Sequence, residues 1–165
     1  MRIKGVVAED FCNYKLPSMF ISTSFCDWKC CTEQGVDIGV CQNAPLATQE
    51  IMDAPVEVLY NLYHNNDITK AVVLGGLEPI LQADEMLDLI RYFRLKGDNC
   101  PFVIYTGYYP DEIQSDIMDK LRDLGNVIVK FGRYIQNSNP RYDSVLGITL
   151  ASENQFAREL DNEDL

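Results

Sequence analysis

The chain has 165 residues, 47% of them hydrophobic, and its 25 acidic against 14 basic residues give a formal net charge of −11 at pH 7. A chain of this length can bury a full hydrophobic core as one domain, so it does not need disulfide bonds. The acidic excess argues against a site for the phosphate backbone of nucleic acids. Charged residues interrupt the first ten positions, and we expect no leader, no membrane span and a cytoplasmic location.

Short apolar runs alternate with amphipathic stretches along the chain, which is typical of an α/β domain with a mainly parallel sheet. Too few strand–helix units fit for an eight-stranded barrel, so we expect a partial parallel β/α barrel. We expect a single domain over 1–165 with a flexible acidic tail at 159–165. The predicted strands are 18–23, 70–74, 102–106 and 127–129, and the predicted helices begin at Pro55, Asp84 and Pro110, with Gly97 and Gly125 closing the last two.

Four of the six cysteines, at positions 26, 30, 31 and 41, lie in one short segment after the first predicted strand. In a reducing compartment, clustered thiols bind metal or do chemistry more often than they form disulfides. Soft thiolates select zinc, copper or iron–sulfur clusters. Because Cys30 and Cys31 are adjacent, their side chains point in different directions, and three ligands with one spare cysteine is the favoured division. A structural zinc loop is the alternative interpretation.

A second candidate feature is Gly75-Gly76, which follows a buried strand and precedes Glu78. Glycine lets the backbone approach a ligand closely, and a carboxylate beside it can accept a hydrogen bond from an ammonium group. Loops at the carboxyl ends of parallel strands gather on one face of the sheet. The cysteine segment, this turn and the turn at Thr106-Gly107 should therefore meet in one site.

Other reactive side chains have simpler interpretations. Cys12 and Cys100 are expected to be buried small hydrophobic residues. His64, the one histidine, is expected at the surface or at a helix C-terminus. Asp111 and Glu112 are interpreted as first-turn charges favoured by the helix dipole.

The cysteine segment resembles the radical S-adenosylmethionine (SAM) superfamily, and specifically the activating proteins of anaerobic ribonucleotide reductases. The motif of that family is Cys-x3-Cys-x2-Cys, followed by an aromatic residue and Asn. This chain has CDWKC at 26–30 and CQN at 41–43, so its spacing is Cys-x3-Cys-x10-Cys. Glu33 stands where the usual spacing would place the third cysteine, and a carboxylate does not replace a thiolate.

The resemblance extends over nearly the whole chain, with its motifs in the family's order. In chain order they are DFCN at 10–13, GGLEP at 75–79, YTGY at 105–108, FGRY at 131–134 and SENQ at 152–155. GGLEP is similar to the turn that contacts the amino group of SAM in that family, with Leu77 as a departure.

The resemblance implies a [4Fe-4S] cluster with one iron left open for SAM. Its ligands would be Cys26, Cys30 and Cys41, with Cys31 as the substitute candidate for Cys30. The residues implied in cofactor binding are Val40, Gln42, Gly75, Gly76, Glu78 and Thr106.

The function implied by the resemblance is reductive cleavage of SAM to a 5′-deoxyadenosyl radical. That radical would install a glycyl radical on a large partner reductase, with a flavodoxin or ferredoxin as electron donor. The implied fold is an incomplete barrel of the radical SAM type. Two alternatives stay open: a radical SAM enzyme acting on another peptide or small molecule, and a non-catalytic zinc or iron–sulfur module.

Overall fold

A seven-stranded sheet forms the centre of the molecule in the computed structural model, which describes residues 1–160. Its strand order is β3-β1-β2-β4-β5-β6-β9, and the four central strands β2, β4, β5 and β6 run parallel. The strands of this sheet are β1 (Arg2–Asp10), β2 (Ser18–Thr23), β3 (Met52–Asp53), β4 (Ala71–Gly75), β5 (Phe102–Tyr105), β6 (Val127–Phe131) and β9 (Phe156–Glu159).

The parallel central strands are covered on both faces. Every residue of β4 and of β6 is buried, as expected for strands packed between two layers. The register places Ile21 beside Leu74, and Val103 beside both Val73 and Ile128. The prediction of an α/β domain with a mainly parallel central sheet is confirmed, whereas the pairings β1–β2, β1–β3 and β6–β9 are antiparallel.

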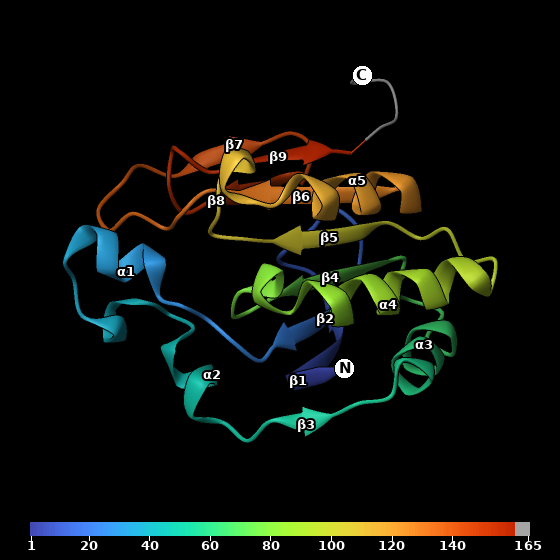
Figure 1. Cartoon of the computed structure of the whole chain (residues 1–165). Helices are drawn as coiled ribbons and strands as arrows, with labels where there is room; N and C mark the ends of the chain where they lie inside the picture. Colours follow the sequence, from blue (N-terminus) through green and yellow to red (C-terminus); the bar gives the residue numbers. More distant parts are fainter. Residues whose placement is uncertain (161–165) are drawn as a thin grey trace.

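Three amphipathic helices cover one face of the sheet (Figure 1). Phe93 of α4 packs edge-on against Phe102 of β5, with ring centroids 5.0 Å apart. The helices that follow the predicted pattern are α3 (Val56–His64), α4 (Ala83–Leu95) and α5 (Ser115–Leu124). The shorter helices are α1 (Lys29–Gln34) and α2 (Ala44–Thr48), and the 3₁₀ turns are η1 (Ile38–Val40), η2 (Pro79–Gln82) and η3 (Pro110–Glu112).

The opposite face of the sheet is covered by a hairpin of β7 (Arg141–Asp143) and β8 (Ile148–Leu150) together with the β1–β2 connection. Tyr14 and Leu146 are buried there in a second apolar cluster. Of the predicted flexible tail, Glu159 ends β9 and Leu160 is buried. Positions 161–165 lie outside the described residues.

Two expectations from the sequence are wrong in detail. The helix predicted from Pro110 is split into η3 and α5, and Ile113 between them is extended. Glu112 forms part of a capping box at the start of η3, accepting the Tyr109 N–H at 2.8 Å, and it pairs with Lys29 and Arg133. Cys12 is exposed because it lies in the β1–β2 connection, whereas Cys100 is buried as predicted.

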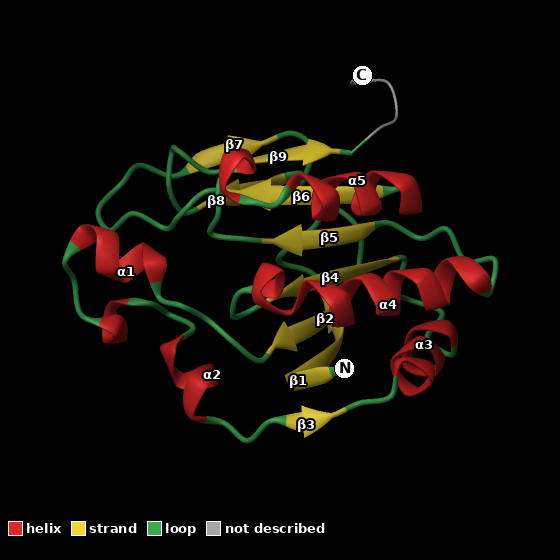
Figure 2. Ribbon diagram, in the orientation of Figure 1, coloured by secondary structure: helices red, strands yellow, loops and turns green. Residues whose placement is uncertain are grey.

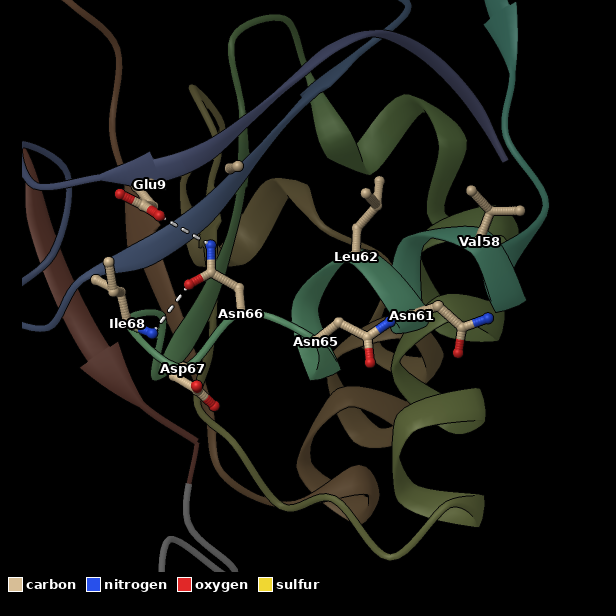
Figure 3. Close-up of a pocket in the computed structure, with 9 residues that line it drawn as sticks. Glu9, Val58, Asn61, Leu62, Asn65, Asn66, Asp67 and Ile68 are labelled. Carbon is tan, nitrogen blue, oxygen red and sulfur yellow. Dashed lines mark hydrogen bonds between the residues drawn. The ribbon is translucent and has the colours of Figure 1, made fainter.

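A surface groove of ≈ 790 Å³ lies between β1 and α3 (Figure 3). Asn66 joins its two walls by donating to Glu9 at 3.2 Å. The groove lies near the amino end of β4, whereas the cysteine segment follows the carboxyl end of β2. No helix within residues 1–160 has the length and apolar character needed to cross a bilayer.

Candidate metal centre

The cysteine segment leaves β2 at its carboxyl end, and a loop over 24–28, which includes Cys26, leads into α1. Figure 2 shows the region between β2 and β3 as short helices joined by loops. The Trp28 N–H donates to Cys26 Sγ at 3.4 Å, and Trp28 and Gly35, which flank α1, both have left-handed backbone angles. Cys30 and Cys31 therefore sit side by side on one turn of helix, where successive side chains point about 100° apart.

Cys30 faces the ends of the parallel strands. A Cβ placed on Gly107 would lie 3.1 Å from Cys30 Sγ, and the backbone of Tyr134 contacts the same thiol. Cys26 lies close enough to Cys30 for the two thiols to interact electrostatically. The Gly107 N–H also donates to Glu78 Oε2 at 2.8 Å. The cysteine segment, the Gly75-Gly76 turn and the Thr106-Gly107 turn thus meet at one end of the sheet.

The Glu78 carboxylate is buried at the centre of this site, with 6% of the residue exposed. Burial raises its pKa, while hydrogen bonds from Gly107, Thr106 and Ile80 act in the opposite direction. The bond from Ile80 N, at 3.1 Å, caps η2. An ionised carboxylate offers about four acceptor positions, so Glu78 can cap the turn and still accept from a ligand.

Cys31 and Cys41 form a second pair of thiols on the other side of α1. Cys31 is buried, with 4% exposure, and lies against the backbone of Cys41. Cys41 follows η1 and joins it to α2. Within residues 1–160, no three His, Cys, Asp or Glu side chains are grouped closely enough to hold a metal ion. Within that part of the chain the structure therefore does not gather the three predicted ligands Cys26, Cys30 and Cys41 into one site, although Cys26 and Cys30 interact electrostatically.

The other residues implied in cofactor binding divide between the strand ends and the cysteine segment. Thr106 is buried beside the Glu78 carboxylate. Gly76 has φ of +78°, which favours glycine, and a Cβ there would meet the Leu46 side chain of α2 at 3.0 Å. Val40 ends η1 and is half-buried, and Gln42 is exposed.

Burial also shifts the pKa of the thiols and of the nearest buried cation, Lys130. It raises the pKa of Cys26 to about 12 and raises the pKa of Cys30. Both thiols are thus protonated at neutral pH until a metal displaces the protons. Lys130 is buried near Cys30 and Glu78, and burial lowers its pKa to about 8.

An ion-pair network that the sequence did not indicate holds α1 against the strand ends. We call it the Arg133 clamp, comprising Arg133, Glu33, Glu112 and Lys29. Arg133 donates to both carboxylate oxygens of Glu112 and to Glu33 Oε1, at 2.5–2.9 Å. Lys29 Nζ donates to Glu112 Oε1 at 2.6 Å. Glu33, at the family's usual third-ligand position, thus binds an arginine here.

Alanine at position 107 is expected to displace the Cys30 thiol, because the added methyl group would lie 3.1 Å from Cys30 Sγ and 3.6 Å from Glu78 Oε2. Overpacking of this size costs about 1–2 kcal/mol of unfolding free energy. Urea unfolding and iron analysis of Gly107→Ala would measure both effects. Gly5→Ala is the control, since nothing lies within 4 Å of its added Cβ. Equal iron contents in the two variants would show that Gly107 is not packed against a ligand.

The donor set fits an iron–sulfur cluster in part. Cys26 and Cys30 supply two soft thiols beside a glycine that leaves room at Cys30, and the segment from Cys31 to Cys41 holds two more. Thiolates bind the iron atoms of such clusters. Cys26 and Cys30 would therefore hold the cluster, with a third thiolate from the following segment.

Comparison with known proteins supports this interpretation. A family model described as "4Fe-4S single cluster domain" matches residues 19–155. No curated protein matches the chain. The matched range begins inside β2, spans the cysteine segment and ends just before β9. Since it covers well over half of the sequence, the chain belongs to the family of 4Fe-4S single cluster domains.

Proposed function

We propose that this protein binds SAM at its iron–sulfur centre and cleaves it reductively to a 5′-deoxyadenosyl radical, which installs a glycyl radical on a partner anaerobic ribonucleotide reductase. The observation that carries the proposal is the meeting of the Cys30 thiol with Gly107 and the Glu78 carboxylate at the carboxyl ends of the parallel strands. The cluster, when bound, supplies the electron that reduces the sulfonium group. The chain itself binds, orients and shields the reactants.

Each residue of the site has a distinct task in this proposal. Cys26 and Cys30 hold the cluster against the Gly107 turn, and Cys41 completes a set of three thiolates. Glu78 accepts a hydrogen bond from the amino group of SAM, using an acceptor position that the η2 cap leaves free. Gly75 and Gly76 let Tyr105 and Leu46 pack closely against the strand end that leads into the Glu78 turn.

The sheet is consistent with an incomplete barrel of the radical SAM type, since its four parallel strands carry the site at their carboxyl ends. The partner would be a large glycyl radical reductase subunit, and the electron would come from a flavodoxin or ferredoxin. Reduced thiols, on which the centre depends, favour action in the cytoplasm.

The direct test is anaerobic reconstitution with iron and sulfide, followed by addition of dithionite and SAM. We expect four irons and four sulfides per chain, and formation of 5′-deoxyadenosine and methionine. Zinc without sulfide would support a structural metal module instead. A complete cluster that leaves SAM intact would support an iron–sulfur protein of another function.

Glu78→Gln is expected to weaken SAM binding about tenfold to a hundredfold, because a hydrogen bond to a charged group contributes about 1.5–3 kcal/mol. Iron content should stay at the wild-type level, since Glu78 is not among the ligands. Isothermal titration of the reconstituted protein with SAM would measure the change. Glu57→Gln, on the exposed surface of α3, is the matched control. Unchanged affinity in Glu78→Gln would place the amino group elsewhere.

A further inference from the structure

Lys130 is a buried cation on the face of the sheet opposite the helices. It lies on β6 beside Tyr105 of β5, and only 6% of the residue is exposed. Its ammonium group donates to Gly132 O at 2.9 Å, and no other hydrogen bond from it is found within residues 1–160. An ammonium group has three donors, and burying it without full pairing costs free energy. The fold therefore keeps a charge here that its own hydrogen bonds compensate only in part.

The surroundings of Lys130 show which groups could compensate the rest of its positive charge. The ammonium lies 5.8 Å from the centre of the Tyr105 ring. Lys130 O accepts the Thr106 N–H at 2.9 Å, and a Cβ on the next residue, Gly107, would meet Cys30 Sγ at 3.1 Å and Glu78 Oε2 at 3.6 Å. Cys30 and Glu78 both act electrostatically on the ammonium. In the described part of the chain, no carboxylate forms an ion pair with it. Arg133 also lies near Cys30, but Glu33 and Glu112 neutralise it. Lys130 is thus the cation beside Cys30 whose charge remains available.

We propose that the Lys130 ammonium is a positioning residue for the cluster: its fixed charge stabilises the thiolate-bound cluster held by Cys30 and raises the midpoint reduction potential of that cluster. The inference rests on the cluster site of the proposed function, and it does not require SAM cleavage.

The physical basis is the low dielectric of the site. Reduction adds one negative charge to the cluster, so a nearby positive charge stabilises the reduced form more than the oxidised form. The same ammonium group is a burden on the apoprotein, where Gly132 O is its one hydrogen-bond acceptor within residues 1–160. Removal of the charge should therefore leave the apoprotein equally or more stable, and it should make the bound cluster less stable. A purely structural lysine would affect both states alike.

Lys130→Met keeps the length of the side chain and removes its charge. In the apoprotein we expect a midpoint of thermal unfolding equal to or above that of the wild type. In the reconstituted protein we expect a more negative midpoint potential, measured by EPR-monitored redox titration, and faster loss of iron to a chelator. Lys130→Arg should restore the potential toward the wild-type value. Lys120→Met, which removes an exposed lysine of α5, should change none of these.

A Lys130→Met protein that carries a full cluster with the wild-type potential would overturn the inference and leave the proposed function untouched. The inference would also fail if the apoprotein were destabilised to the same extent as the cluster-bound protein. If Lys130→Met does not fold, Lys130→Gln gives the same test with a polar side chain. A wild-type protein that takes up no cluster would instead remove the proposed function together with this inference.

Discussion

Replacing Cys30 by alanine is expected to abolish iron binding, whereas replacing Cys31 by alanine is expected to leave the iron content near the wild-type level. The two residues are adjacent on α1, but their environments differ. Cys30 faces Gly107 and the backbone of Tyr134, next to Cys26. Cys31 is buried on another side of the helix, away from the strand ends. A side chain that points into the packing of the loop cannot reach a cluster at the strand ends without unwinding the helix.

Cys26→Ala should lose iron as completely as Cys30→Ala, because both residues are among the three predicted ligands and their thiols interact electrostatically. Cys41→Ala tests whether Cys41 is the third ligand, since Cys41 lies with Cys31 in this structure. We expect it to lose iron, which requires the segment around η1 to move when the cluster binds. That segment is short and is held by local bonds, among them Gly39 N to the Asp37 carboxylate at 2.7 Å.

The measurement is iron and sulfide per chain after anaerobic reconstitution, together with the visible absorption of the cluster. Cys12→Ala and Cys100→Ala are matched controls, because one of these thiols is exposed and the other is buried, and both lie outside the cysteine segment. Loss of iron in Cys31→Ala combined with retention in Cys41→Ala would make Cys31 the third ligand. Retention of iron in Cys30→Ala would overturn the site itself.

The central strands and the long helices were predictable from the sequence because each is encoded locally. The strand 18–23 was predicted with the bounds of β2, and Gly125 closes α5 as expected. The site was partly predictable for the same reason, since Gly75-Gly76 and Thr106-Gly107 directly follow apolar runs. Parallel pairing then brings their loops to one end of the sheet.

The rest of the site depends on contacts between residues that are far apart in the sequence, and no local pattern encodes such contacts. Glu33 and Arg133 are 100 positions apart, and nothing in either neighbourhood indicates their ion pair. Glu112 has the features of an ordinary first-turn charge, yet its partner Arg133 lies in the loop that follows β6. The position of Cys41 depends on how the segment after α1 folds back, and spacing alone does not determine that path.

Arg133→Met is expected to lower the free energy of unfolding by about 3 kcal/mol, because breaking a buried ion pair leaves its partners uncompensated. The Arg133 side chain is 6% exposed, against 24% for Glu112 and 48% for Glu33. Most of the loss should therefore come from Glu112. Urea unfolding would measure the change. Arg122→Met removes an exposed ion pair with Asp119 and should cost less than about 1 kcal/mol. Equal losses in the two variants would show that the Arg133 clamp is not a major source of stability.

The stability that the Arg133 clamp supplies should also depend on pH in a defined direction. Arg133, and after it Lys29 and the Tyr109 N–H, hold the pKa of Glu112 well below its usual range. A carboxyl group whose folded-state pKa is depressed stabilises the fold fully above its unfolded pKa, which is about 4.3 for glutamate. That contribution is lost as pH falls toward the folded value.

The stability gap between the wild type and Glu112→Gln should therefore be constant near neutral pH and should shrink as the pH falls below about 4.3. Urea unfolding of both proteins across this range measures the gap directly. Glu57→Gln, which removes an exposed carboxylate of α3, should show no such convergence with the wild type. A gap that stays constant into the acid range would mean that Glu112 contributes through packing alone, and α1 would then owe its position to contacts other than the Arg133 clamp.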